Sequence, residues 1–251
     1  LETILVLYPN HEKKESIAFV AATAHVLLQK INNSLGYNST SILEIDSIST
    51  HISCIVLFLI GNSQADAAEM ANHLFITSEI SLTKQKLVSY IQALGKGNLD
   101  EILNNPITEE EIENKYLQEV ALDYLWREIG LGIYSIAERL TSKIDIKHES
   151  NFFNRVIDLS SAEDNFLNQK STFAGPYHLA KLLRILEGDI LNRAVINIPT
   201  PNGVDAILWE SFLEKLAKER PYLWENHKDA VDTNFLDPGI SSVLTLPTGA
   251  G

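Results

Sequence analysis

The spacing of apolar residues constrains the fold most strongly, because it follows a helical period along most of the chain. In the range 12–33, seven apolar side chains recur at steps of three and four residues: Ile17, Val20, Ala21, Ala24, Leu27, Leu28 and Ile31. This spacing places them on one face of a helix. The same reasoning predicts helices at 65–75, 81–97, 152–157, 177–186 and 205–219, and a long helix that begins near residue 108.

Signals for β-strands are scarce by comparison. Two β-branched runs bounded by turn residues occur, "RAVINIP" and the terminal "SSVLTL". We therefore expect a mainly α-helical, multi-helix domain with the beginning of a different unit attached. Two helix ends have clear signals: Gly95 and Gly97 end the helix at 81–97, and Thr108 with Glu111 forms a capping box.

Charge and composition narrow the classes of function. The net charge is −13, so the chain is a poor candidate for binding nucleic acid by itself. The longest apolar run, 55–60, is too short to span a membrane, and the single cysteine, Cys54, suits a reducing compartment. We expect a cytoplasmic protein without a membrane partner. Acidic residues are concentrated in 100–128, where they predict a solvated helix face or, alternatively, a surface that docks a basic protein partner.

Ser63 is a candidate nucleophile. It follows the apolar run "IVLFLI" in the segment "GNSQA", which resembles the strand, turn and helix of a hydrolase nucleophile elbow. The usual second glycine is replaced by Ala65. The alternative interpretation of the same residues is a buried helix interrupted by Gly61, followed by a second helix capped by Asn62 or Ser63.

A metal site is a second candidate in the same region. Asp66, Glu69 and His73 are spaced by three and four residues, which puts them on one side of a helix. The alternative interpretation is a solvated polar face, since no HExxH or CxxC motif accompanies them.

The C-terminal stretch "SSVLTLPTGAG" differs from the rest of the chain. A strand signal leads into a turn whose glycines allow backbone N–H groups to approach phosphate oxygens. In a complete phosphate loop, Lys and then Ser or Thr would follow, to contact phosphates and magnesium. We therefore expect this chain to be a piece of a larger polypeptide.

The segment "LPTGAG" resembles the start of motif I in superfamily-two helicases of the DEAD/DEAH-box class. The general phosphate-loop pattern has a glycine where Leu246 stands, and the helicase version commonly replaces that glycine. Upstream, Leu223, His227 and Ala230 match the spacing of the adenine-reading region of this family, although the family has Gln where His227 stands. The alternative interpretation of this segment is an amphipathic helix from Trp224 to Phe235 that binds no ligand. The long helical region also resembles large bacterial helicases of anti-phage defence systems, Hachiman-type among them.

This resemblance implies three segments: a helical accessory domain at 1–195, a linker and connecting helix at 196–220, and the start of a RecA-like ATPase domain at 221–251. Pro199 and Pro201 support the linker because both block helix continuation.

The resemblance also implies ATP and Mg²⁺ as cofactors of the larger protein and nucleic acid as its partner. ATP contacts are expected from Thr248, Gly249, Ala250, Gly251, His227 and Tyr222, with Tyr222 or Trp224 stacking on the base. The chain by itself is expected neither to carry a bound cofactor nor to hydrolyse ATP, because the remaining motifs of the family are not in it. Its backbone donors alone would give weak anion affinity at best. The alternatives are a helical protein-interaction module and a serine hydrolase that uses Ser63.

Overall fold

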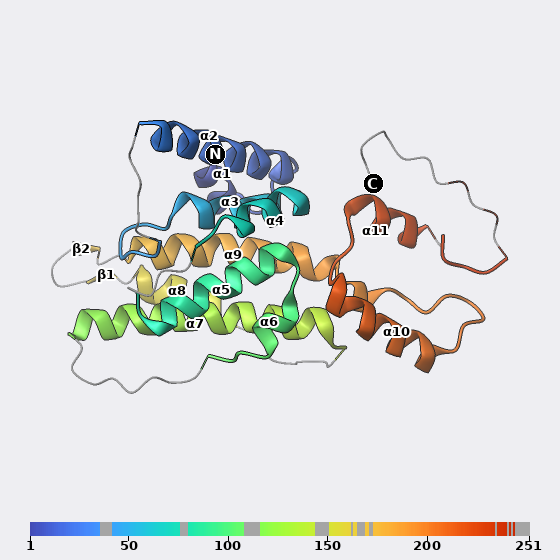
Figure 1. The fold of residues 1–251 in the computed structure, drawn as a ribbon. Coiled ribbons are helices and arrows are strands. Elements are labelled where there is room, and N and C mark those ends of the chain that lie inside the picture. The colour runs from blue at the N-terminus through green and yellow to red at the C-terminus, as the bar shows by residue number, and fades with distance from the viewer. Residues whose placement is uncertain are drawn as a thin grey trace.

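The computed structural model of the chain is mainly α-helical (Figure 1). It describes residues 1–35, 42–75, 80–107, 116–143, 151–161, 163–164, 169–170, 173–233, 235–239, 241 and 243. Within these ranges the chain forms eleven α-helices, and its strands are two residues long. The prediction of a mainly α-helical chain is therefore confirmed. None of the described helices combines the length and the apolar character needed to cross a membrane.

The elements follow one another along the chain in this order: α1 Glu2–Leu7, α2 Lys14–Ser34, α3 Thr50–Ile60, α4 Gln64–Asn72, α5 Leu82–Lys96, α6 Leu99–Leu103, α7 Leu117–Thr141, α8 Phe152–Ser160, β1 Glu163–Asp164, β2 Gln169–Lys170, α9 Ala174–Asn192, the 3-10 helix η1 Val195–Asn197, α10 Ala206–Glu219 and α11 Glu225–Asp232. The two short strands pair antiparallel.

Helix α3 lies at the centre of the N-terminal half. Every residue from Ile52 to Ile60 is buried, and α3 contacts α2, α4, α5 and α9. A helix that is apolar all round must be surrounded in this way. Helix α9 also contacts α7 and α8, so it joins the two halves of the bundle, while α10 and α11 lie at one end (Figure 1).

The helix predicted at 12–33 is confirmed as α2, but small residues make its contact with the core. Ala18, Ala21 and Ala22 are buried, whereas Leu27 and Ile31 are more than half exposed. The alanines allow the α2 backbone to approach α3 closely, and Cys54 of α3 donates its thiol hydrogen to the Ala22 carbonyl.

The prediction of a strand in "RAVINIP" is wrong. This segment forms η1 and an isolated bridge between Ala194 and Tyr222. The consecutive side chains of Val195 and Ile196 are both buried, which alternation along a half-exposed strand does not allow. Both belong to the same hydrophobic cluster as Leu213 of α10. The domain boundary near residue 195 stays a prediction. Most of "SSVLTL" lies outside the described residues.

The residues predicted to end or cap helices do not all have that role in the structure. Gly97 adopts φ 72° and caps α5, as predicted. Gly95 instead lies buried inside α5, where an added Cβ would come 2.8 Å from Cγ2 of Ile55. Thr108 and Glu111 lie outside the described residues, and α7 begins at Leu117 with the Glu119 carboxylate accepting a hydrogen bond from the Tyr116 N–H at 3.2 Å.

A carboxylate attaches α1 to the bundle. Glu2 contacts Nε2 of His25 on α2 and, at 2.9 Å, Nε2 of His178 on α9. Burial alone would raise the pKa of Glu2, but the hydrogen bonds and charges of His178 and His25 outweigh it and lower the pKa to about 2. The ionised form is therefore the one that the folded state stabilises.

We predict that Glu2→Gln destabilises the protein in a pH-dependent way. Because the folded pKa of Glu2 lies below its ordinary value of 4.5, the stabilisation is fully present above pH 4.5 and is lost as the pH falls to about 2. Urea unfolding followed by circular dichroism should show a deficit for Glu2→Gln near pH 6 that shrinks near about pH 2. Glu12→Gln, at an exposed position of the same region, is the control. A deficit that does not change with pH would contradict the assignment.

The N-terminus of α9 approaches the 42–48 loop unusually closely. The Gly175 N–H donates to the Ile45 carbonyl at 2.9 Å, and a Cβ on Gly175 would lie 2.1 Å from the Glu44 carbonyl oxygen. The opposing atom belongs to the backbone, so it cannot move aside as a flexible side chain would. In contrast, a Cβ on Gly188 of the same helix meets nothing within 4 Å.

We therefore predict opposite effects from two alanine substitutions in α9. Gly175→Ala should lower the free energy of unfolding by about 1–3 kcal/mol, through steric overlap with the loop. Gly188→Ala should raise it by about 0.5–1 kcal/mol, through helix propensity. Thermal and urea unfolding of the two variants provide the measurement, and equal effects would show that the close approach does not exist.

Candidate functional site

Two of the six predicted ATP contacts lie on one pocket of the described structure. Tyr222 and His227 line a cavity of about 520 Å³ at the junction of α10 and α11. We call it the junction pocket; its lining residues are Gln64, Lys96, Gly97, Val195, Leu216, Glu219, Arg220, Pro221, Tyr222, Leu223, Trp224 and His227. The other four predicted contacts, Thr248, Gly249, Ala250 and Gly251, lie outside the described residues.

A short extended segment positions the pocket residues. Pro221 follows the last turn of α10, and the segment then runs antiparallel to residues 193–195. The Val195 N–H donates to the Pro221 carbonyl at 2.9 Å, and the Leu223 N–H donates to the Arg193 carbonyl at 2.7 Å. These backbone bonds hold the chain that enters α11 against the end of α9.

A buried arginine ties this segment to the centre of the bundle. Arg193 is 8% exposed and donates from Nη1 to Oδ1 of Asn62, in the turn between α3 and α4. Its Nε also donates to the Asp189 carbonyl at 3.4 Å. Asn62 adopts φ 59°, a conformation that asparagine tolerates better than most residues. The junction pocket is therefore held by groups distant in sequence.

Trp224 and His227 form the aromatic part of the pocket. Trp224 is the N-cap residue of α11, and His227 lies in its first turn. Their rings stack in parallel, with centroids 5.5 Å apart and an interplanar angle of 9°. The indole remains 40% exposed, so it offers surface for a further planar group.

Tyr222 is less accessible than the sequence interpretation assumed. It is half-buried and packs against the hydrophobic core. Burial raises the pKa of its phenol to about 12, and the charge of Arg193 opposes this shift only in part. The hydroxyl therefore stays protonated and belongs to the pocket wall, which leaves Trp224 as the better stacking surface.

Sequence reasoning missed the charged side of the junction pocket. Lys96 comes from the end of α5 and lines the same cavity as Arg220 and Glu219 at the end of α10. The left-handed glycine cap at Gly97 was recognisable in the sequence, but its proximity to residues 219–227 was not. Tertiary packing alone places these groups together.

The nucleophile-elbow interpretation of Ser63 is wrong, because the strand it needs is a helix. Residues 50–60 form α3, whose N-cap, Ser49, accepts a hydrogen bond from the Ile52 N–H. The Ser63 hydroxyl donates to the Gly61 carbonyl at 3.5 Å. The alternative of two helices interrupted at Gly61 is confirmed, and Ser63 occupies the N-cap position of α4, although its side chain makes no capping hydrogen bond.

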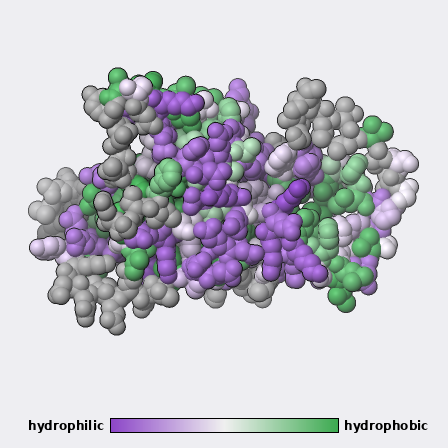
Figure 2. All heavy atoms as spheres, viewed as in Figure 1, coloured by the Kyte–Doolittle hydropathy of each residue, from purple (hydrophilic) through white to green (hydrophobic). Residues whose placement is uncertain are grey.

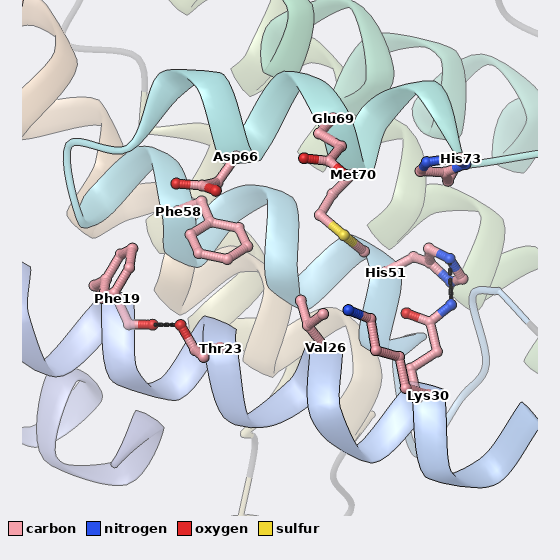
Figure 3. Close-up of a pocket in the computed structure, with 11 residues that line it drawn as sticks. Phe19, Thr23, Val26, Lys30, His51, Phe58, Asp66, Glu69, Met70 and His73 are labelled. Carbon is pink, nitrogen blue, oxygen red and sulfur yellow. Dashed lines mark hydrogen bonds between the residues drawn. The ribbon is translucent and has the colours of Figure 1, made fainter. Parts of the chain in front are cut away.

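Asp66 and Glu69 of α4, and His73 directly after this helix, line a second cavity of about 440 Å³ between α2, α3 and α4 (Figure 3). Lys30 and His51 line it too, and its floor is apolar. Burial and the charge of nearby His73 lower the pKa of His51. Within the described ranges, no three His, Cys, Asp or Glu side chains are arranged to hold a metal ion, so the structure does not support the metal interpretation.

The acidic stretch at 100–128 is not solvated throughout. Glu128 is 4% exposed, and its carboxylate accepts a hydrogen bond from Nη1 of Arg155 on α8 at 2.7 Å. This pair joins α7 to α8, so the prediction of a solvated face is wrong at this position. Asp100 and Glu119 are exposed, as predicted, and residues 108–115 lie outside the described part.

Comparison of the chain with protein-family models, with curated proteins and with solved structures finds no match.

Proposed function

We propose that this chain is the N-terminal part of an ATP-dependent nucleic-acid helicase or translocase, and that the junction pocket receives the adenine of ATP. The observation that carries the proposal is the convergence of Tyr222, Trp224 and His227 on one pocket, in a segment that precedes "LPTGAG" in the sequence. In this proposal Thr248, Gly249, Ala250 and Gly251 contact the phosphates, and Mg²⁺ is held by residues of the larger protein.

The size and chemistry of the junction pocket suit an adenine nucleotide. Its volume of about 520 Å³ lies within the range of small-ligand sites. The exposed indole of Trp224 offers a stacking surface, and the imidazole of His227 offers one hydrogen-bond donor and one acceptor. Lys96 and Arg220 provide positive charge for phosphate groups, which a nucleoside lacks.

Nucleic acid would bind elsewhere in such a protein. The chain carries 33 acidic and 20 basic residues, and this excess of acid repels a phosphate backbone. The helical part would then serve as an accessory domain for partner binding or regulation, attached to the motor through the backbone bonds between residues 193–195 and 221–223.

The proposal predicts weak nucleotide binding that depends on Trp224. ATP, ADP and adenosine should each change the tryptophan fluorescence of the chain, because a stacked base shields the indole. Trp224→Ala should weaken binding about tenfold or more, as expected for the loss of one base-stacking contact. Binding is measured by isothermal titration calorimetry, since the substitution removes the fluorescent reporter.

Two further variants test whether the positive side chains of the junction pocket contact the phosphate groups of ATP. Lys96→Met and Arg220→Met should weaken the binding of ATP but leave adenosine unchanged, because adenosine has no phosphate. Phe212→Ala is the matched aromatic control, since it removes a half-exposed ring of α10 outside the junction pocket. If ATP fails to bind, or binds Trp224→Ala as tightly as the wild type, the pocket is not the adenine site.

A further inference from the structure

Helix α2 presents to solvent a stripe of mostly apolar residues that is covered at its N-terminal end alone. Its members are spaced by three, four, three, four and three residues, the heptad pattern of a coiled-coil seam: Ile17, Val20, Ala24, Leu27, Ile31 and Ser34. We call these six residues the α2 seam. Val20, Leu27 and Ile31 are 53%, 56% and 55% exposed, respectively.

The α2 seam is not the face that α2 uses in its own fold. Ala18 and Ala22 make the contact with the core on the opposite side of the helix, and Ala21, which is also buried, lies at the edge between the two faces. An outward helix face is ordinarily polar, so a helix with two apolar faces indicates a second packing partner. Ile17, at the N-terminal end of the seam, is partly buried against the core, whereas the other five residues of the seam are exposed in the described part of the structure. Figure 2 shows hydrophobic atoms along the upper edge of the molecule, over α2.

The charge of α2 indicates what kind of partner fits. Between residues 16 and 35 there is no acidic residue, and the one charged side chain apart from histidine is Lys30. The whole chain has a net charge of −13, so most of its surface would repel another copy. The α2 seam is where two copies can meet without opposing carboxylates. It also offers no acidic groups to attract a basic partner.

We propose that the α2 seam is a self-association surface, on which α2 of one copy packs antiparallel to α2 of a second copy. In the antiparallel register that aligns the seams, Val20 faces Ile31 of the second copy and Ala24 faces Leu27 of the second copy. Each layer then combines a smaller and a larger side chain, which favours interdigitated packing. A two-fold axis generates both halves of the contact from the same residues.

The residues that flank the seam are compatible with this register. Lys30 lies beside Thr23 of the second copy, so no like charges are brought together. Leu28 and Leu35 are 48% and 64% exposed on the other flank and would become covered.

The size of the α2 seam sets the expected affinity of the dimer. Helix α2 has 21 residues and is therefore about 30 Å long. One helix pair of this length buries less than the roughly 800 Å² per partner of a stable interface. We therefore expect a weak dimer, with a dissociation constant on the order of 10–100 µM.

Sedimentation velocity tests the proposal on the intact chain. Between about 1 µM and about 500 µM, the mass should rise from the monomer value of 28.0 kDa toward twice that value. Leu27→Glu should weaken the association at least tenfold, because it places a carboxylate in the seam of both copies. Leu208→Glu is the control, since it introduces the same charge at a 71% exposed leucine of α10 and should leave the dimer unchanged.

Cysteine pairing tests the orientation. A mixture of Val20→Cys and Ile31→Cys chains should form a mixed disulfide under mild oxidation, whereas Val20→Cys alone should not, because residue 20 does not face itself in the antiparallel register. Cys54 is buried and does not interfere. A monomer at every concentration, a dimer insensitive to Leu27→Glu, or efficient coupling of Val20→Cys to itself would overturn the proposal. None of these outcomes bears on the ATP site, because the α2 seam and the junction pocket share no residue.

Discussion

The complete burial of α3 is the constraint on which the rest of the bundle depends. Nine consecutive residues from Ile52 to Ile60 are buried, so α3 is stable only when other helices surround it. Small side chains make this possible: Ala18 and Ala22 of α2 and Ala67 of α4 are fully buried beside it. Even the turn that follows is tight, since a Cβ on Gly61 would lie 3.0 Å from the Phe19 nitrogen.

The second decisive feature is the junction between α9 and α11. Arg193 is buried, contacts the α3–α4 turn through Asn62, and offers its carbonyl to the Leu223 N–H. One residue therefore connects the centre of the bundle to the wall of the junction pocket.

Part of the site could be predicted from sequence. The helix that was the alternative interpretation of residues 224–235 forms as α11, with Trp224 as its N-cap residue and stacked on His227, while the base-reading role of this segment stays a prediction. Lys96 could not be assigned to this site, because it is more than 120 positions before Trp224 in the chain. The strand predicted at "RAVINIP" was wrong because β-branched composition does not reveal that consecutive side chains will both be buried.

The sequence by itself determined that the chain is helical and where most of its helices lie, since local apolar periodicity and caps such as Gly97 act within a few residues. Only the tertiary structure decided which face of each helix is inside. In α2 the alanine face packs inward and the large aliphatic side chains of the α2 seam remain outside, because close approach to a fully buried α3 requires small residues at the contact. That choice depends on the neighbouring helix and is not encoded in the period of α2 itself.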